Sequence, residues 1–229
     1  MFLWLAKNRS VSAQNSENVG MKPIHATFCH VGGGHSEWHI QADALEIVKM
    51  EWDMVLAFPP CTHLASSGAT WFLEKQKDGR QQMGIGFFLA FTALDHVPMV
   101  AIENPIGIMS SMYRKPDQII QPWQLGDNYS KSTCLWLKGL PPLNPIVTEQ
   151  PELEWFEWTD KKTGKKKRQP KWFADAWKLP PTERALVRSK TFPGIAKAMA
   201  EQWGALDVPA IEQTEEPKRQ QWEQIRFDL

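Results

Sequence analysis

The residues best suited to chemistry are a cysteine and a glutamate that each follow an apolar run. Cys61 comes after residues 53–58 (DMVLAF) and two prolines, and Glu103 and Asn104 follow residues 97–102 (VPMVAI). Short continuous apolar runs are typical of strands buried on both faces. Ligands of an open parallel sheet bind beyond the carboxyl ends of its strands. A thiol and a carboxyl group at neighbouring strand ends would form a nucleophile and an acid, provided that the thiol is activated and the carboxyl can donate a proton.

The same two residues also have a purely structural interpretation. A cysteine behind a stiff Pro-Pro turn is often a small buried side chain, and Glu103 would then be an exposed strand cap. The chain has three cysteines, at positions 29, 61 and 134. Because they are widely spaced and odd in number, we interpret each of them as a free thiol and not as half of a disulfide.

The elements that must position Cys61 and Glu103 alternate between strand and helix. The pattern predicts strands at residues 2–6, 24–31, 53–58, 97–102 and 133–137, and helices at residues 43–50 and 84–94. The second of these runs ends at three glycines, a punctuation that fits a strand entering a loop. This alternation predicts an α/β domain, Rossmann-like and doubly wound, with a mostly parallel sheet.

A basic β-hairpin is expected to follow this core. Aromatic flanks (WFEWTD and QPKWF) enclose a glycine-containing turn, and residues 161–171 hold seven of the 26 lysines and arginines. Such a hairpin can grip phosphates and stack bases through Lys165, Lys166, Lys167 and Arg168. It can equally be a solvated turn, balanced by the acidic residues before it. The predicted organisation is a core at 1–148, a hairpin and linker at 149–178, helices completing the core at 179–204 and a polar tail at 205–229.

Composition narrows the class of protein. Hydrophobic residues make up 42% and charged residues 23%, which excludes a fully disordered chain or a fibre. Basic and acidic residues number 26 each, so any basic surface must be local. No run approaches the roughly 18 apolar residues of a membrane span, and the start turns polar too early for a secretory signal. We therefore expect no membrane partner and a cytoplasmic location, in the host cytoplasm if the protein is phage-encoded.

Several motifs carry a family resemblance. AFPPCTHLASSG (57–68) and AIENP (101–105) resemble the catalytic PPC and ENV segments of cytosine C5 DNA methyltransferases. The chain is more closely similar to compact, phage-type members of that superfamily, from about residue 25 to residue 204. The motifs that carry this similarity are HIQADALEIV, PPCTHLASSG, ENP, KPDQIIQPWQLGD, STCLWLKGLPPL and TFPGIAKAMAEQWG.

The resemblance implies a mechanism. Cys61 would add as a thiolate to C6 of cytosine, Glu103 would protonate N3, and C5 would take a methyl group from S-adenosylmethionine. Asn104 would help to fix the loop that carries Glu103. The acceptor would be DNA, with its target base flipped out or single-stranded, or a free nucleotide. The target sequence and the oligomeric state are left open.

The resemblance also assigns binding residues. Asp43 falls where the family contacts the adenine of the cofactor, and the same residue is a good N-cap for the helix that follows it. Lys131 lies near the place where larger relatives have an arginine that grips the cytosine. The complete cofactor set is Ala6, His30, Asp43 and Pro59. The substrate set is Pro60, Ser67, Lys131 and Thr133, together with the four hairpin residues named above.

Two departures from the family pattern support other hypotheses. The first strand enters a turn (LAKNRSVSAQ) without glycine, and the second ends in histidine where the family has an acidic residue that holds the ribose hydroxyls. A second hypothesis is therefore a DNA-binding protein of methyltransferase fold that is inactive or has an altered cofactor, such as a phage counter-defence protein. A third is a metal-dependent activity, although the spacing matches no standard zinc site, and no metal is included in the predicted site. The residues behind this third hypothesis are His25, Cys29, His30, His35, His39, Cys61 and His63.

Overall fold

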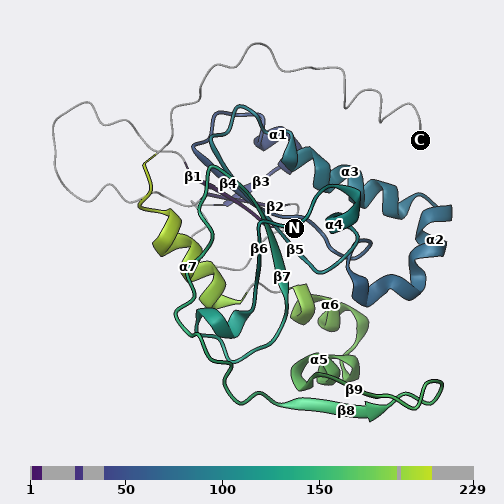
Figure 1. Ribbon diagram of the computed structural model, residues 1–229. Coiled ribbons are helices and arrows are strands. Elements are labelled where there is room, and N and C mark those ends of the chain that lie inside the picture. Colours follow the sequence, from purple (N-terminus) through teal and green to yellow (C-terminus); the bar gives the residue numbers. More distant parts are fainter. Residues whose placement is uncertain (1, 7–23, 28–38, 190–191, 208–229) are drawn as a thin grey trace.

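A seven-stranded sheet with helices on both faces forms the body of the protein (Figure 1). The computed structural model describes residues 2–6, 24–27, 39–189 and 192–207. The strands lie in the order β3-β2-β1-β4-β5-β7-β6. Their bounds are β1 Phe2–Ala6, β2 Ile24–Thr27, β3 His39–Gln41, β4 Met54–Phe58, β5 Met99–Pro105, β6 Gln118–Ile120 and β7 Thr133–Lys138. The predicted α/β class is confirmed.

The sheet is mixed, so the expectation of a mostly parallel sheet is wrong for most neighbouring strands. Among the described strands, β4–β5 and β2–β3 are parallel, whereas β1–β2, β1–β4, β5–β7 and β6–β7 are antiparallel. Strands β1 and β7 are therefore antiparallel to the other five strands of this sheet. A short apolar run predicts that a strand is buried but carries no information on its direction. The segment joining β6 to β7 contains no α-helical crossover, the connection that parallel neighbours need.

Alternate residues of the central strands point into two separate cores. On β4, Val55 and Ala57 face one core, and Met54 and Leu56 face the other, as the two-residue period of a strand requires. The first core is covered by α1 and α3 and the second by α7 (Figure 1). The helices are α1 Ala44–Ile47, α2 Phe72–Lys77, α3 Arg80–Thr92, α4 Met109–Met112, α5 Lys171–Asp175, α6 Pro181–Ser189 and α7 Pro193–Trp203.

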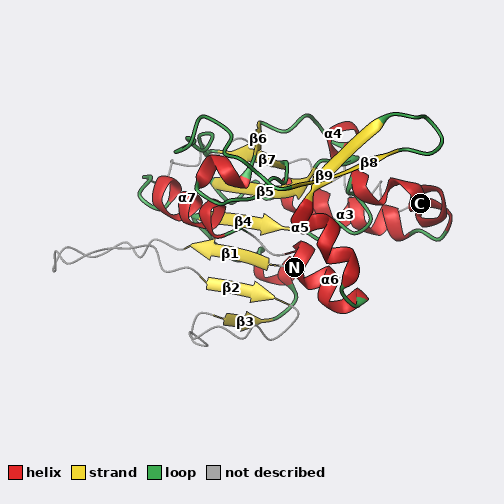
Figure 2. Cartoon of the chain, turned by 90° about the horizontal axis from the view of Figure 1, so that it is seen from below, coloured by secondary structure: helices red, strands yellow, loops and turns green. Residues whose placement is uncertain are grey.

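The predicted β-hairpin is confirmed. Strands β8 (Trp155–Thr159) and β9 (Lys166–Pro170) pair antiparallel as a separate two-stranded sheet, which extends along one side of the body (Figure 2). Its turn is held by Asp160, whose Oδ1 accepts hydrogen bonds from the backbone N–H groups of Lys162 and Thr163, both at 2.9 Å. Gly164 provides the positive φ of 67°.

Residues 208–229 of the predicted polar tail lie outside the described residues. Among the helices that the structure describes, none has both the length and the apolar character to cross a lipid bilayer.

Candidate active site

Cys61 and Glu103 lie at the same edge of the sheet. Strands β4 and β5 are parallel neighbours, with Ala57 aligned to Ile102, so the residues that follow these positions meet at one edge. Both side chains are partly buried. The groups are near enough for the charge of Glu103 to raise the pKa of the Cys61 thiol. The structure therefore brings together the nucleophile and the acid that the sequence predicts.

Asn104 ties the ends of the two strands together. Its buried Nδ2 donates a hydrogen bond of 2.9 Å to the carbonyl oxygen of Pro59. Pro59 is buried and Pro60 is exposed, and these two residues connect β4 to Cys61. The bond from Asn104 therefore fixes the start of the cysteine loop relative to the strand that carries Glu103.

A second set of contacts joins the loops that follow β4 and β5. Ala65 and Gly107 form an antiparallel bridge, and the N–H of Ile108 donates to the carbonyl oxygen of Leu64 at 3.0 Å. A Cβ on Gly107 would lie 2.2 Å from the same carbonyl oxygen. Glycine is therefore required at position 107 because the two loops approach so closely.

The charges around the pair act on both groups. Burial, followed by the charge of Glu103, raises the pKa of Cys61, whereas Lys131 and then Arg188 act to lower it. Burial also raises the pKa of Glu103, against the opposing effects of Lys131 and of the hydrogen bond from Thr133. Burial thus favours a neutral carboxyl that can donate a proton, and the two cations favour the thiolate.

Thr133 and Lys131 lie beside Cys61 and Glu103, and their part in substrate binding stays a prediction. Thr133 is buried on β7, and its Oγ1 donates a hydrogen bond of 2.5 Å to Oε1 of Glu103. The Lys131 Nζ donates to the carbonyl oxygen of Arg188 at 3.2 Å and lies 5.6 Å from the ring centroid of Phe192. Lys131, two residues before β7, therefore contacts α6 beside Cys61 and Glu103.

Arg188 is a residue that the sequence reasoning missed. It is half-buried on α6, with its guanidinium carbon 4.1 Å from the ring centroid of Phe173 and 5.4 Å from that of Trp177. Burial, the largest cause, lowers the pKa of Arg188, and the Cys61 thiolate opposes this effect. The sequence predicts helices within residues 179–204, but helical periodicity gives no information on which distant loop an arginine reaches.

The remaining substrate residue of the core, Ser67, is exposed. It lies on the 3-10 helix Ser66–Trp71, six positions after Cys61. No feature of its surroundings assigns it a role.

The predicted cofactor residues do not assemble at one edge. Asp43 follows β3 at the Cys61 edge, where its Oδ1 accepts a hydrogen bond of 2.9 Å from the N–H of Leu45, so its N-cap role is confirmed. Ala6, however, is aligned with Met54 at the opposite edge because β1 runs antiparallel to β4. His30 lies outside the described residues. Because Ala6 is at the wrong edge, the described residues do not fit the S-adenosylmethionine site that the resemblance implies.

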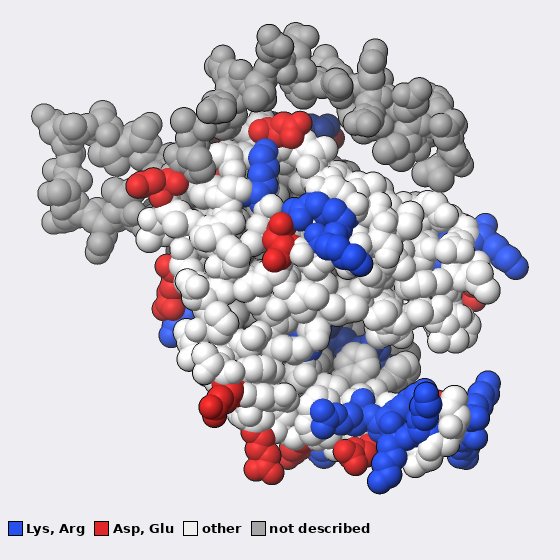
Figure 3. All heavy atoms as spheres, in the orientation of Figure 1, with Lys and Arg blue, Asp and Glu red and all other residues white. Residues whose placement is uncertain are grey.

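The four predicted hairpin residues are all exposed. Lysine and arginine side chains gather over β8 and β9, at the lower right of Figure 3. Lys167 pairs with Asp160, and Arg168 lies 4.4 Å from the ring centroid of Trp155. Lys165 and Lys166 form no salt bridge with any residue that the structure describes. The hairpin is therefore a local basic surface on a chain without net charge.

The histidine cluster is not assembled in the described part of the chain. Among the residues whose side chains the structure describes, no three histidines, cysteines or acidic residues come close enough to hold a metal ion. The side chains of five members of the cluster are not among those described: His25, Cys29, His30, His35 and His39.

Comparisons with protein-family models, with curated proteins and with solved structures found no match to this chain.

Proposed function

We propose that the chain is a DNA cytosine C5 methyltransferase-like enzyme, in which Cys61 forms a covalent adduct with the target base. The observation that carries this proposal is the position of a thiol and a carboxyl group with a raised pKa at neighbouring strand ends. Perturbed titratable groups that share a site are characteristic of catalytic centres.

The order of the strands supports a Rossmann-like, doubly wound core. When the antiparallel β7 is left out, the order is 3-2-1-4-5-6, the order of dinucleotide-binding folds. In such sheets the ligand lies at the carboxyl ends of the strands, where the strand order reverses. That point is between β1 and β4 here, and Cys61 follows β4. The reversed direction of β1 is the departure from this fold.

The side chains account for activation of the base. The Cys61 thiolate forms a bond to C6 of the ring, and the displaced electron pair reaches N3, which takes a proton from the Glu103 carboxyl. C5 is then nucleophilic. The resemblance implies S-adenosylmethionine as the donor of the one-carbon group. Because the described residues do not fit that cofactor, the chemistry derived from them ends at the activated C5.

The neighbouring residues prepare this step. Lys131 and Arg188 stabilise the thiolate electrostatically, because each acts to lower the pKa of Cys61. Thr133 holds one carboxyl oxygen of Glu103, which leaves the other oxygen to face the ring. Asn104 and Gly107 keep the two loops in register. These contacts support the proposal for the activation of the base, up to the nucleophilic C5.

A trapping experiment tests the proposal. DNA that contains 5-fluorocytosine lacks the C5 proton that must leave, so in the presence of S-adenosylmethionine the adduct should persist and shift the protein on a denaturing gel. Cys61→Ser should form no adduct, and the matched control Cys134→Ala, at a buried thiol on β7, should still form it. Absence of an adduct with the unaltered protein, with or without added cofactor, would count against the chemistry.

A second candidate function is a DNA-binding protein that lacks this cofactor or has an altered one. The position of Ala6 at the edge opposite Cys61 favours it. Calorimetry with S-adenosylmethionine separates the two candidates. Micromolar binding would remove the support for the second candidate, and absence of binding would strengthen it.

A further inference from the structure

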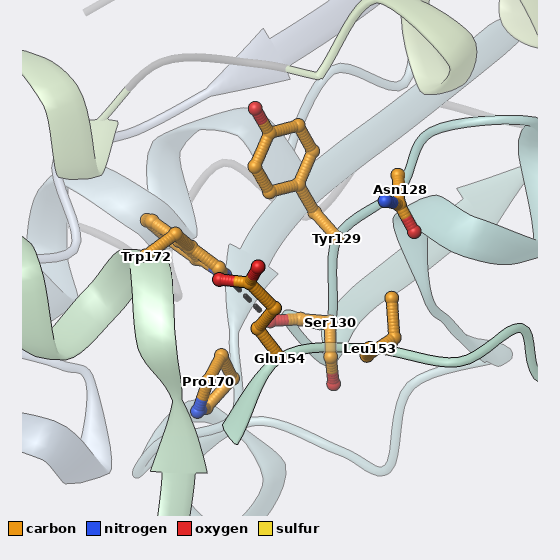
Figure 4. Close-up of a pocket in the computed structure, with 7 residues that line it drawn as sticks. All are labelled: Asn128, Tyr129, Ser130, Leu153, Glu154, Pro170 and Trp172. Carbon is orange, nitrogen blue, oxygen red and sulfur yellow. Dashed lines mark hydrogen bonds between the residues drawn. The ribbon is translucent and has the colours of Figure 1, made fainter. Parts of the chain in front are cut away.

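A hollow of about 210 Å³ lies at the base of the hairpin (Figure 4). Tyr129, with 43% of its surface exposed, and Trp172 supply its aromatic walls. The Nε1 of Trp172 donates to the carbonyl oxygen of Ser130 at 3.2 Å, which fixes the indole ring. The remaining lining residues are Asn128, Leu153, Glu154 and Pro170. The lining is mostly polar, and its two aromatic rings provide a surface on which a flat base can stack.

The hollow is close to the candidate active site along the chain. Ser130 lines the hollow, and Thr133, three residues later, holds Glu103. Three residues span at most about 11 Å, and successive nucleotides of a stacked strand are about 3.4 Å apart. A strand whose target base lies at Cys61 can therefore place a base only a few positions away in the hollow.

The hairpin continues this surface with aromatic and basic groups. Phe156 and Trp158 are 50% and 38% exposed, and their ring centroids are 5.9 Å apart with an interplanar angle of 28°. The register places Lys167 opposite Trp158 and therefore on the same face. Residues 160–171 hold seven basic side chains and one acidic side chain. Within the described part of the chain, salt bridges are absent for Lys161, Lys162, Lys165, Lys166 and Arg168.

We propose that the hollow and the hairpin together bind a single strand of nucleic acid. One base near the target stacks on Tyr129, further bases stack on Phe156 and Trp158, and the phosphates lie along the basic side chains of the hairpin. Stacking on aromatic rings in a basic groove is the usual way in which proteins hold unpaired strands. Paired bases of a duplex do not offer their faces to these rings. The inference rests on the proposed function and narrows its acceptor from a free nucleotide to a polynucleotide.

Binding of a fluorescent 20-nucleotide DNA strand to Cys61→Ser, followed by anisotropy, tests the inference without any chemistry. The single strand should bind more tightly than a duplex of the same sequence. Tyr129→Ala and the double variant Phe156→Ala/Trp158→Ala should each weaken binding roughly tenfold. The hairpin aromatics are exposed, so circular dichroism of the second variant should match that of the parent. This keeps the test informative if Tyr129→Ala misfolds.

The salt dependence of strand binding separates direct contacts with phosphates from a general effect of the protein's charge. The variant Lys161→Ala/Lys162→Ala/Lys165→Ala, in the turn next to Trp158, should reduce the slope of log K against log salt concentration by about 2, since each phosphate contact to a single strand contributes about 0.7. A control with the same loss of charge, Lys49→Ala/Lys77→Ala/Lys197→Ala, should leave the slope unchanged; these lysines lie just after α1, on α2 and on α7. Equal binding of duplex and strand, or equal effects of the two triple variants, would overturn the inference.

The outcomes also separate this inference from the proposed function. Strand binding without a 5-fluorocytosine adduct would contradict the proposed function and leave the inference standing. An adduct with the free nucleotide, together with no binding of the strand, would support the proposed function and contradict the inference.

Discussion

Thr133 Oγ1 donates a hydrogen bond of 2.5 Å to Oε1 of Glu103, across the antiparallel pair of β7 and β5. The bond acts to lower the pKa of the glutamate, against the burial that raises it. Buried carboxyls without such a partner retain their proton more strongly. Thr133 is therefore a positioning residue that also sets the pH range in which Glu103 can donate a proton.

The proposed reaction needs a thiolate at Cys61 and a protonated carboxyl at Glu103. If the carboxyl has a lower pKa than the thiol, the rate of the reaction plotted against pH is bell-shaped. Its acidic midpoint follows the pKa of Glu103, and its alkaline midpoint follows the pKa of Cys61. The three electrostatic predictions that follow are measured on this profile.

Thr133→Val should move the acidic midpoint to higher pH. The substitution removes a hydrogen bond that lowers the pKa of Glu103, so the folded-state pKa should rise further. The alkaline midpoint should stay in place. Thr70→Val, at an exposed threonine on the 3-10 helix Ser66–Trp71, is a suitable control. An acidic midpoint unchanged from that of the parent would show that the hydrogen bond does not influence the proton of Glu103.

Lys131→Met should move both midpoints to higher pH. The lysine acts to lower the pKa of Cys61 and that of Glu103, and methionine keeps much of the apolar stem while removing the charge. Lys49→Met, just after α1, removes a charge at an exposed position, where Lys49 pairs with Glu46. Movement of only one midpoint in Lys131→Met would contradict the joint action of this lysine.

Arg188→Met should move the alkaline midpoint alone to higher pH. Its charge acts to lower the pKa of Cys61 and is not among the groups that act on Glu103. Arg188→Lys, which keeps the charge but loses the planar contact with Phe173, should restore part of the shift. A profile unchanged from that of the parent would mean that α6 does not act on the thiol.

Gly107→Ala should destabilise the protein by about 1 to 3 kcal/mol and lower the activity. The new Cβ would meet the carbonyl oxygen of Leu64 at 2.2 Å and would force apart the loops that follow β4 and β5, beside Cys61 and Glu103. Urea denaturation measures the loss. Gly86→Ala, inside α3 with no atom within 4 Å of the added Cβ, is the matched control. It should be neutral or stabilising by up to about 1 kcal/mol, and equal losses in the two variants would rule out a clash between the loops.

The sequence predicts the positions of the central elements well. The buried strands before Cys61 and Glu103, the helix covering them and the basic hairpin are confirmed because their signals are local: apolar runs, helical spacing and a glycine turn. The short strands β3 and β6, of three residues each, carry too little pattern for such a signal. The N-cap of Asp43 is also local and is confirmed.

The sequence pattern could not predict features that depend on contacts between residues far apart in the chain. The direction of β1 depends on pairing with β2 and β4, so Ala6 lies at the edge opposite to the one predicted. Arg188 reaches the pair only because α6 packs through Phe173 and Trp177. The hollow at the hairpin base joins residues 128–130 with residues 153–172, which no single segment of the sequence reveals.

Exchange of the cytosine H5 proton in heavy water tests the central claim most directly, because it needs no methyl donor. Addition of the Cys61 thiolate to C6 lets C5 take a deuteron. Loss of the original proton and of the sulfur then returns deuterated cytosine and the free thiolate. We expect the H5 signal of a cytosine-containing strand to decay with the unaltered protein and with Cys134→Ala, at least 100-fold more slowly with Glu103→Gln, and not at all with Cys61→Ser. Decay at the same rate with Cys61→Ser, or a stable H5 signal with the unaltered protein at every pH, would contradict the account.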